Sequence, residues 1–122
     1  MNTAIVMLGS NTDALNNLNR AKELLSACFE IVKESSVISS KPVGKNYKSE
    51  FSNKAVILLS VETEEETKSI FKDIETEMGR TQQSKKTGIV PIDIDLIFWN
   101  DKQVHVDYDR FDFVRNCIKE IW

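Results

Sequence analysis

An apolar run of β-type residues extends from Pro91 to Trp99 and is interrupted only by Asp93 and Asp95. Its pattern predicts a strand, in which side chains two residues apart project from the same face of a sheet. Two ionised carboxylates on so apolar a strand repel each other and lose hydration unless a cation lies between them. Oxygen ligands favour a hard cation such as Mg²⁺, which often accompanies a phosphorylated substrate. The alternative is that this face of the strand simply meets water.

Hydrophobic periodicity divides the remaining chain into strands and helices. Short apolar runs predict strands at residues 4–8, 31–39 and 51–62. Helical spacing predicts a first helix from residue 11 or 12, with a buried face that consists of Leu15, Leu18, Ala21, Leu25 and Cys28. A second helix is predicted from Thr63, which has the spacing of a capping box with Glu66, to Gly79. The tail, residues 111–122, has room for a short helix.

The order of these elements, β-α-β-β-α-β, indicates a ferredoxin-like α+β fold, in which two helices cover one face of an antiparallel sheet. This topology brings several polar segments to one rim of the sheet. They are the end of the first strand (residues 9–11), the loop 40–50, the start of the next strand (residues 51–54), Arg80 at the end of the second helix, and Asp93. A functional site is expected at this rim.

Composition narrows the class of protein. The 122 residues suit a single domain spanning 1–122, and 41% hydrophobic with 29% charged residues indicates a folded chain. A net charge of −3 disfavours binding to nucleic acid or to a membrane surface. Cys28 and Cys117 lack metal-type spacing and are expected to be buried thiols in a reducing compartment. Residues 1–8 lack the pattern of a signal peptide, so a cytoplasmic location is expected.

Five segments in register carry a resemblance to a known family. They are Leu8-Gly9-Ser10-Asn11, residues 40–44, residues 51–56, residues 74–80 and residues 91–98. In this order they resemble the motifs of the 6-hydroxymethyl-7,8-dihydropterin pyrophosphokinases of folate biosynthesis. The resemblance implies a ferredoxin-like core and transfer of pyrophosphate from ATP to the pterin hydroxymethyl oxygen, which leaves AMP. It also implies two Mg²⁺ ions as cofactors.

The resemblance implies roles for particular residues. Asp93 and Asp95 would hold both Mg²⁺ ions, and Arg80 and His105 would join them as catalytic residues. The pterin site would consist of Ser40, Lys41, Val43, Phe51, Asn53 and Phe113, with Asn53 offering a donor and an acceptor. The ATP site would consist of Glu75, Arg80, Lys85, Lys86, His105 and Arg110. Simpler roles stay open: Asn53 as a turn cap, Phe51 as a core residue, His105 as an exposed strand residue, and Lys85 and Lys86 as solvated loop residues.

The chain departs from the family pattern in its last third. The connection from Trp99 to His105 is shorter than in the family, and the positions of family arginines and a tryptophan read Gln82, Thr87, Val90 and Phe111. Two functions therefore stay open, a pterin pyrophosphokinase and a pterin- or nucleotide-binding module without turnover. Both have small molecules as partners, without nucleic acid or membrane. Either is compatible with a monomer or with a weak homodimer paired through edge strands.

Overall fold

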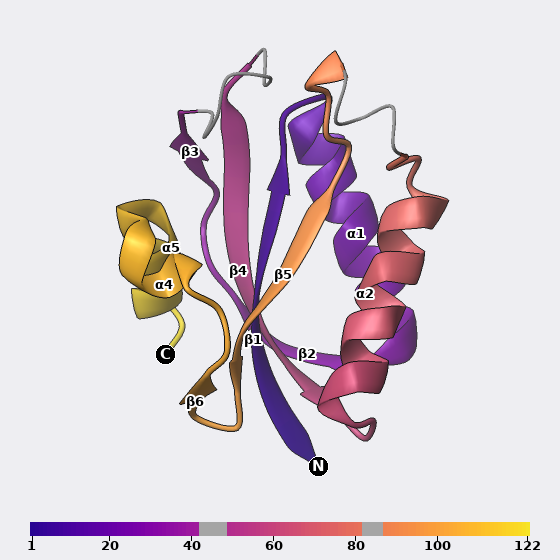
Figure 1. The fold of residues 1–122 in the computed structure, drawn as a ribbon, viewed down its shortest axis with the longest axis vertical. Coiled ribbons are helices and arrows are strands. Elements are labelled where there is room, and N and C mark those ends of the chain that lie inside the picture. Colours follow the sequence, from indigo (N-terminus) through magenta and orange to yellow (C-terminus); the bar gives the residue numbers. More distant parts are fainter. Residues whose placement is uncertain (42–48, 82–86) are drawn as a thin grey trace.

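The structure, a computed structural model, describes residues 1–41, 49–81 and 87–122 (Figure 1). Within these residues the strands form one sheet in the order β2-β4-β1-β5-β6, and β3 also pairs with β4. The elements are β1 (Asn2–Ser10), α1 (Ala14–Cys28), β2 (Glu30–Glu34), β3 (Ile38–Ser40), β4 (Phe51–Ser60), α2 (Glu64–Glu77), β5 (Asp93–Trp99), β6 (Lys102–Gln103), α4 (Asp107–Arg110) and α5 (Asp112–Lys119).

The central strand, β1, is antiparallel to both of its neighbours, β4 and β5. In this register Gly9 lies opposite Asn53 on one side and opposite Asp93 on the other. The ferredoxin-like α+β fold predicted from the sequence is thus confirmed. The register places two of the predicted site residues on either side of one glycine.

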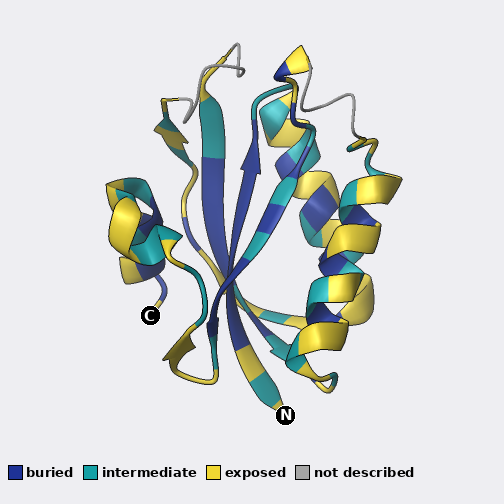
Figure 2. Ribbon diagram, viewed as in Figure 1, coloured by how far each residue is buried: buried dark blue, intermediate teal, exposed yellow. Residues whose placement is uncertain are grey.

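Each face of the sheet has its own core. Helices α1 and α2 cover one face, and the shorter α4 and α5 lie over the other (Figure 1). The first core contains Leu8, Leu25 and Phe71, and the second contains Met7 and Ile118. Most of β1 and the middle of β4 are buried between these layers (Figure 2). Each fully buried aliphatic or aromatic side chain contributes about 1.5–3 kcal/mol to stability.

Helix α2 begins as the sequence predicts. Thr63 caps it by accepting a hydrogen bond from the Glu66 backbone N–H at 3.1 Å, and the Thr63 hydroxyl lies 2.9 Å from the Glu66 carboxylate. At the other end Gly79 has φ of 96°, a left-handed conformation that glycine adopts without strain. The Arg80 backbone N–H then donates to the Glu75 carbonyl at 3.0 Å. This ending places Arg80 beside β5.

The structure corrects several details of the predicted elements. The strand expected at residues 31–39 consists of two short strands, β2 and β3. Between them, the Ser35 backbone N–H donates to the Ala55 carbonyl and the Ser35 hydroxyl accepts from the Ala55 backbone N–H. This side-chain hydrogen bond interrupts the regular pairing of the strand. Helix α1 starts only at Ala14, and Leu15 and Cys28 are exposed rather than buried. The tail, residues 111–122, forms the short helix expected there, α5, and the additional helix α4 precedes it. In the described part of the chain no helix has the length and apolarity needed to cross a membrane.

Candidate functional site

Two cavities open at the rim of the sheet. The first cavity, of about 270 Å³, lies between the sheet and the α4–α5 segment. The second cavity, of about 670 Å³, lies between α2 and β5. Asp93 and Asp95 line both cavities, as expected for two side chains on one face of β5 near its start. The two carboxylates therefore form the boundary across which the cavities meet.

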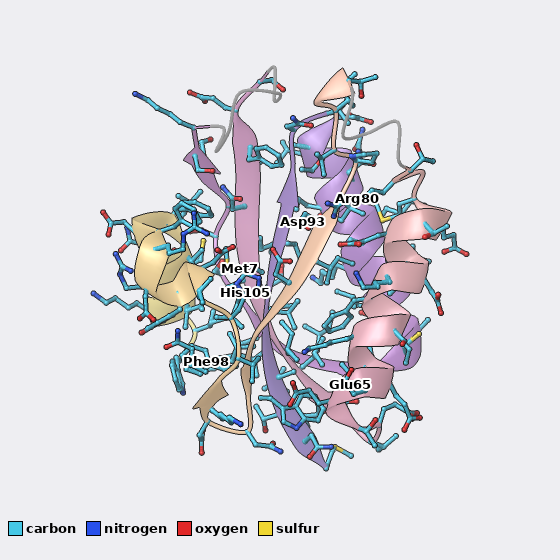
Figure 3. The ribbon with its side chains drawn as sticks, in the orientation of Figure 1. Met7, Glu65, Arg80, Asp93, Phe98 and His105 are labelled. Carbon is cyan, nitrogen blue, oxygen red and sulfur yellow. The ribbon has the colours of Figure 1, made fainter. Side chains whose placement is uncertain are left out.

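On the side of the second cavity, Asp93 is already paired with a cation. The Arg80 Nη1 atom lies 2.6 Å from Asp93 Oδ1 and 3.1 Å from Glu75 Oε2 (Figure 3). Glu75 Oε2 also accepts the Ile94 backbone N–H at 2.7 Å, and burial raises the pKa of Glu75. Arg80 thus links the end of α2 to the start of β5 through two carboxylates.

Asp95 has no such partner. In the described residues the nearest basic side chain is His105, whose Nε2 atom lies 4.0 Å from Asp95 Oδ1. Burial, together with the nearby charges of Asp93, Asp107 and Glu75, raises the pKa of Asp95 to about 9. Crowded carboxylates of this kind are the donor set of a hard divalent cation, so these residues fit Mg²⁺.

The ring of His105 is held by the residue two positions further along. The Asp107 backbone N–H donates to His105 Nδ1 at 3.1 Å. Because Nδ1 accepts this hydrogen bond, we infer that the neutral ring carries its proton on Nε2, the nitrogen that faces Asp95. His105 therefore presents an N–H donor to the site, where it suits a phosphate oxygen or a carboxylate.

Asn53 lies in the wall of the first cavity and is only 5% exposed. Its Nδ2 atom donates to Ser40 Oγ at 2.8 Å and to the Ile38 carbonyl at 3.0 Å. The sequence suggested that Asn53 would offer a ligand both a donor and an acceptor, but the donor is engaged within the protein. Among residues 1–41, 49–81 and 87–122 no group donates to the oxygen, Oδ1, so this amide atom can accept from a ligand.

Aromatic rings line the rest of the first cavity. Phe51, Phe111 and Phe113 contribute to its wall, and the rings of Phe111 and Phe113 stack at 5.5 Å between centroids. The Arg110 guanidinium lies 5.0 Å from the centre of the Phe111 ring. A flat heterocycle is the kind of ligand that such a wall accommodates.

The structure brings together most of the residues singled out from the sequence. Ser40, Lys41, Phe51, Asn53 and Phe113 line the first cavity, and Glu75, Arg80 and His105 line the second. Arg110, expected on the ATP side, lines the first cavity instead, because α4 folds back over that face. Val43, Lys85 and Lys86 lie outside the described residues.

Sequence reasoning overlooked two kinds of residue. Asp107 lines the first cavity, and Lys68 and Lys72 line the second. The two lysines have helical i, i+4 spacing on α2 beside its buried face, a pattern that does not separate a ligand site from a solvated surface. Asp107 had a usable signal, because it lies two residues after the single histidine of the chain.

The fold and the site together define a class: a ferredoxin-like α+β protein with a crowded carboxylate site where two cavities meet. A family model described as 7,8-dihydro-6-hydroxymethylpterin-pyrophosphokinase matches residues 5–122. The chain belongs to this family, in agreement with the resemblance found from its motifs.

Two curated relatives are similar to this chain. A 2-amino-4-hydroxy-6-hydroxymethyldihydropteridine pyrophosphokinase of Bacillus subtilis (strain 168) is 30% identical over 109 residues, which cover 87% of this chain and 65% of that protein. A folate synthesis bifunctional protein of Arabidopsis thaliana is 27% identical over 105 residues, which cover 84% of this chain and 22% of that protein. The chain thus spans less than two thirds of the length of either relative.

Proposed function

We propose that this chain transfers pyrophosphate from ATP to the hydroxymethyl oxygen of 6-hydroxymethyl-7,8-dihydropterin, with release of AMP and with two Mg²⁺ ions as cofactors. Family membership supports this proposal. The observation that carries it is the position of Asp93 and Asp95, which line both cavities. Group transfer between two bound molecules requires the donor and the acceptor to meet at one place, and these carboxylates mark it.

The first cavity suits the pterin. Asn53 Oδ1 is available as an acceptor for the N–H groups of the heterocycle, and Ser40 holds the amide in that orientation. Phe51 and Phe113 offer apolar surfaces to the flat ring. Lys41 stands at the edge of the same cavity.

The second cavity suits ATP. Bound Mg²⁺, held by Asp93 and Asp95, would neutralise phosphate oxygens and align them for in-line transfer. Arg80 and the Nε2–H of His105 are positioned to donate to the phosphates, and Lys68 and Lys72 add positive charge along α2. Arg80 is held by Glu75 and Asp93, so it is oriented before the nucleotide arrives.

The test is a direct assay of AMP release. Purified chain, ATP, MgCl₂ and the hydroxymethyl dihydropterin are incubated, and nucleotides are separated by chromatography. We expect AMP that depends on the pterin and on Mg²⁺, and a loss of at least a hundredfold in rate for Asp95→Asn. Asp73→Asn is the matched control, since Asp73 is an exposed aspartate on α2 that lines neither cavity.

One outcome would favour the binding module instead. If the chain binds the pterin at micromolar concentration but releases no AMP, the catalytic proposal is wrong and the site serves only for binding. If neither molecule binds, both functions are contradicted.

A further inference from the structure

A third carboxylate, that of Asp107, joins the cavity boundary from the α4 side. Its side chain is about one-quarter exposed and lies in the wall of the first cavity. Oxygens of Asp107 and Asp95 and a ring nitrogen of His105 all lie within 4.8 Å of one another. These residues come from β5, from the segment after β6, and from α4, so the fold rather than sequence adjacency gathers them.

Asp107 is poorly neutralised by the protein. In the described residues no group donates a hydrogen bond to its carboxylate. Its ion-pair contacts are long, 3.6 Å to His105 Nδ1 and 3.9 Å to the exposed Arg110. Since Nδ1 of His105 accepts the Asp107 backbone N–H, the neutral ring offers no proton to the Asp107 carboxylate. Asp93 differs in this respect, because Arg80 neutralises its carboxylate in an ion pair of 2.6 Å.

The imidazole is a weak candidate for a metal ligand. Nε2 faces Asp95, but the hydrogen bond at Nδ1 keeps the ring proton on Nε2. Coordination through Nε2 would require that proton to leave and the backbone hydrogen bond to break. The available donor set therefore consists of oxygens, which suits Mg²⁺ or Mn²⁺.

We propose that Asp107 is a metal ligand, which together with Asp95 holds the divalent cation nearest the first cavity. Asp95 then stands between two carboxylate neighbours, Asp93 on the side of Arg80 and Asp107 on the side of the first cavity. This assignment rests on the proposed function, because it adds a residue to the cation site of that reaction. It also explains why the Asp107 carboxylate lies in the wall of the first cavity without a close cationic partner among the described residues.

Binding of Mn²⁺ alone tests the assignment without any turnover. MnCl₂ is titrated into the full chain, and free Mn²⁺ is measured by electron paramagnetic resonance. We expect Asp107→Asn to weaken Mn²⁺ binding at least tenfold, whereas Asp73→Asn stays within twofold of the unmodified chain. Asparagine keeps the backbone N–H that holds His105, so the substitution removes only the charge.

A double-mutant cycle separates ligation from general charge. If Asp95 and Asp107 bind the same ion, Asp95→Asn and Asp107→Asn are strongly non-additive, because either change alone disrupts that ion. The single histidine supplies a local probe, since Mn²⁺ near Asp95 and Asp107 broadens the proton resonances of the His105 ring. We expect this broadening to need a higher Mn²⁺ concentration in Asp107→Asn.

The outcomes are distinct. Unchanged Mn²⁺ affinity and unchanged broadening in Asp107→Asn overturn the assignment, even when the unmodified chain releases AMP. Weakened Mn²⁺ binding in a chain that releases no AMP supports the assignment and contradicts the proposed function. Asp107→Glu, which restores an oxygen ligand, is expected to bind Mn²⁺ more tightly than Asp107→Asn, and thermal melting confirms that each variant is folded.

Discussion

Gly9 and Asn53 lie opposite each other in neighbouring strands, and a Cβ atom added to Gly9 would lie 3.2 Å from Asn53 Oδ1. The same atom would lie 3.6 Å from the Phe51 ring. The missing side chain at Gly9 thus leaves room for the Asn53 amide oxygen in the wall of the first cavity. Glycine is required here for close approach rather than for an unusual backbone angle.

Gly9→Ala is therefore expected to weaken pterin binding while the chain stays folded. The added methyl group presses on Asn53 Oδ1, which must shift by a few tenths of an ångström and so loses its alignment with a ligand. We expect the dissociation constant for the pterin to rise about tenfold, or roughly 1.4 kcal/mol. Calorimetric titration measures this change, and ATP binding serves as the internal control. Equal losses for pterin and ATP would indicate general distortion instead.

The raised pKa of Asp95 makes the stability of the metal-free chain depend on pH. Its folded pKa, about 9, lies above the unfolded value of a carboxyl group, so the folded state holds a proton that the unfolded state releases. Stability from this group is fully present below about pH 4 and is lost as the pH rises toward 9. Asp95→Asn removes the dependence, so we expect it to raise the melting temperature at pH 8 by several degrees.

Urea unfolding at pH 6, 7 and 8 in the presence of EDTA checks this prediction, with Asp73→Asn as the charge-matched control. Added MgCl₂ is expected to stabilise the unmodified chain most at the highest pH, where Asp95 is most readily ionised. If Asp95→Asn and Asp73→Asn show the same pH profile, the proposed crowding at Asp95 is wrong.

Much of the fold could be predicted from local patterns. Strong sequence signals mark four elements, because each of them buries one or both of its faces. These signals are the apolar runs of β1, β4 and β5 and the amphipathic spacing of α2. Thr63 and Gly79 mark the ends of α2 by side-chain capping and by a left-handed backbone angle, two effects that act within a few residues. The order of these elements then restricted the topology to very few choices.

Other features depend on contacts between distant residues. The break between β2 and β3 comes from Ser35, whose hydroxyl accepts a hydrogen bond from the backbone N–H of Ala55, twenty residues away. No local sequence pattern signals this break. The position of the tail depends on the second core, in which Ile118 of α5 packs with Met7 of the sheet, and Glu120 adds hydrogen bonds that it accepts from Ser36. That docking determines why Asp107 and Arg110 reach the first cavity.

An ion pair between a buried lysine and an exposed glutamate gives a prediction for stability alone. Lys54 is 8% exposed, and its Nζ atom lies 2.5 Å from Glu34, which also pairs with Lys22. Hydrogen bonds from Lys22 and Lys54 lower the pKa of Glu34. Glu34→Gln leaves the ammonium of Lys54 without its counter-charge, and we expect a loss of about 1–3 kcal/mol in unfolding free energy.

Glu30→Gln is the control for that variant, because Glu30 is an exposed glutamate in the same strand, β2. The cost of Glu34→Gln should also shrink on acidification, since a carboxylate with a lowered pKa contributes stability above its unfolded pKa and loses it as the pH falls. Equal destabilisation by the two substitutions, measured in urea at pH 7, would show that Lys54 does not depend on Glu34.

Arg80 supplies the last prediction, which concerns the link between α2 and β5. One of its guanidinium nitrogens contacts Asp93 and Glu75 together, so it sets the position of a carboxylate of the proposed metal site, and Arg80 also lines the second cavity. Arg80→Lys keeps the charge but loses the planar fork, and lysine cannot hold both carboxylates and donate to phosphate in the same geometry. We expect kcat for AMP release to fall by about ten- to a hundredfold with a smaller change in KM for ATP, because the lost contacts serve orientation.

Arg20→Lys on the exposed face of α1 is the matched control. A rise in KM with kcat unchanged would mean that Arg80 contributes binding alone, and its pairing with Asp93 would then have no part in aligning the site.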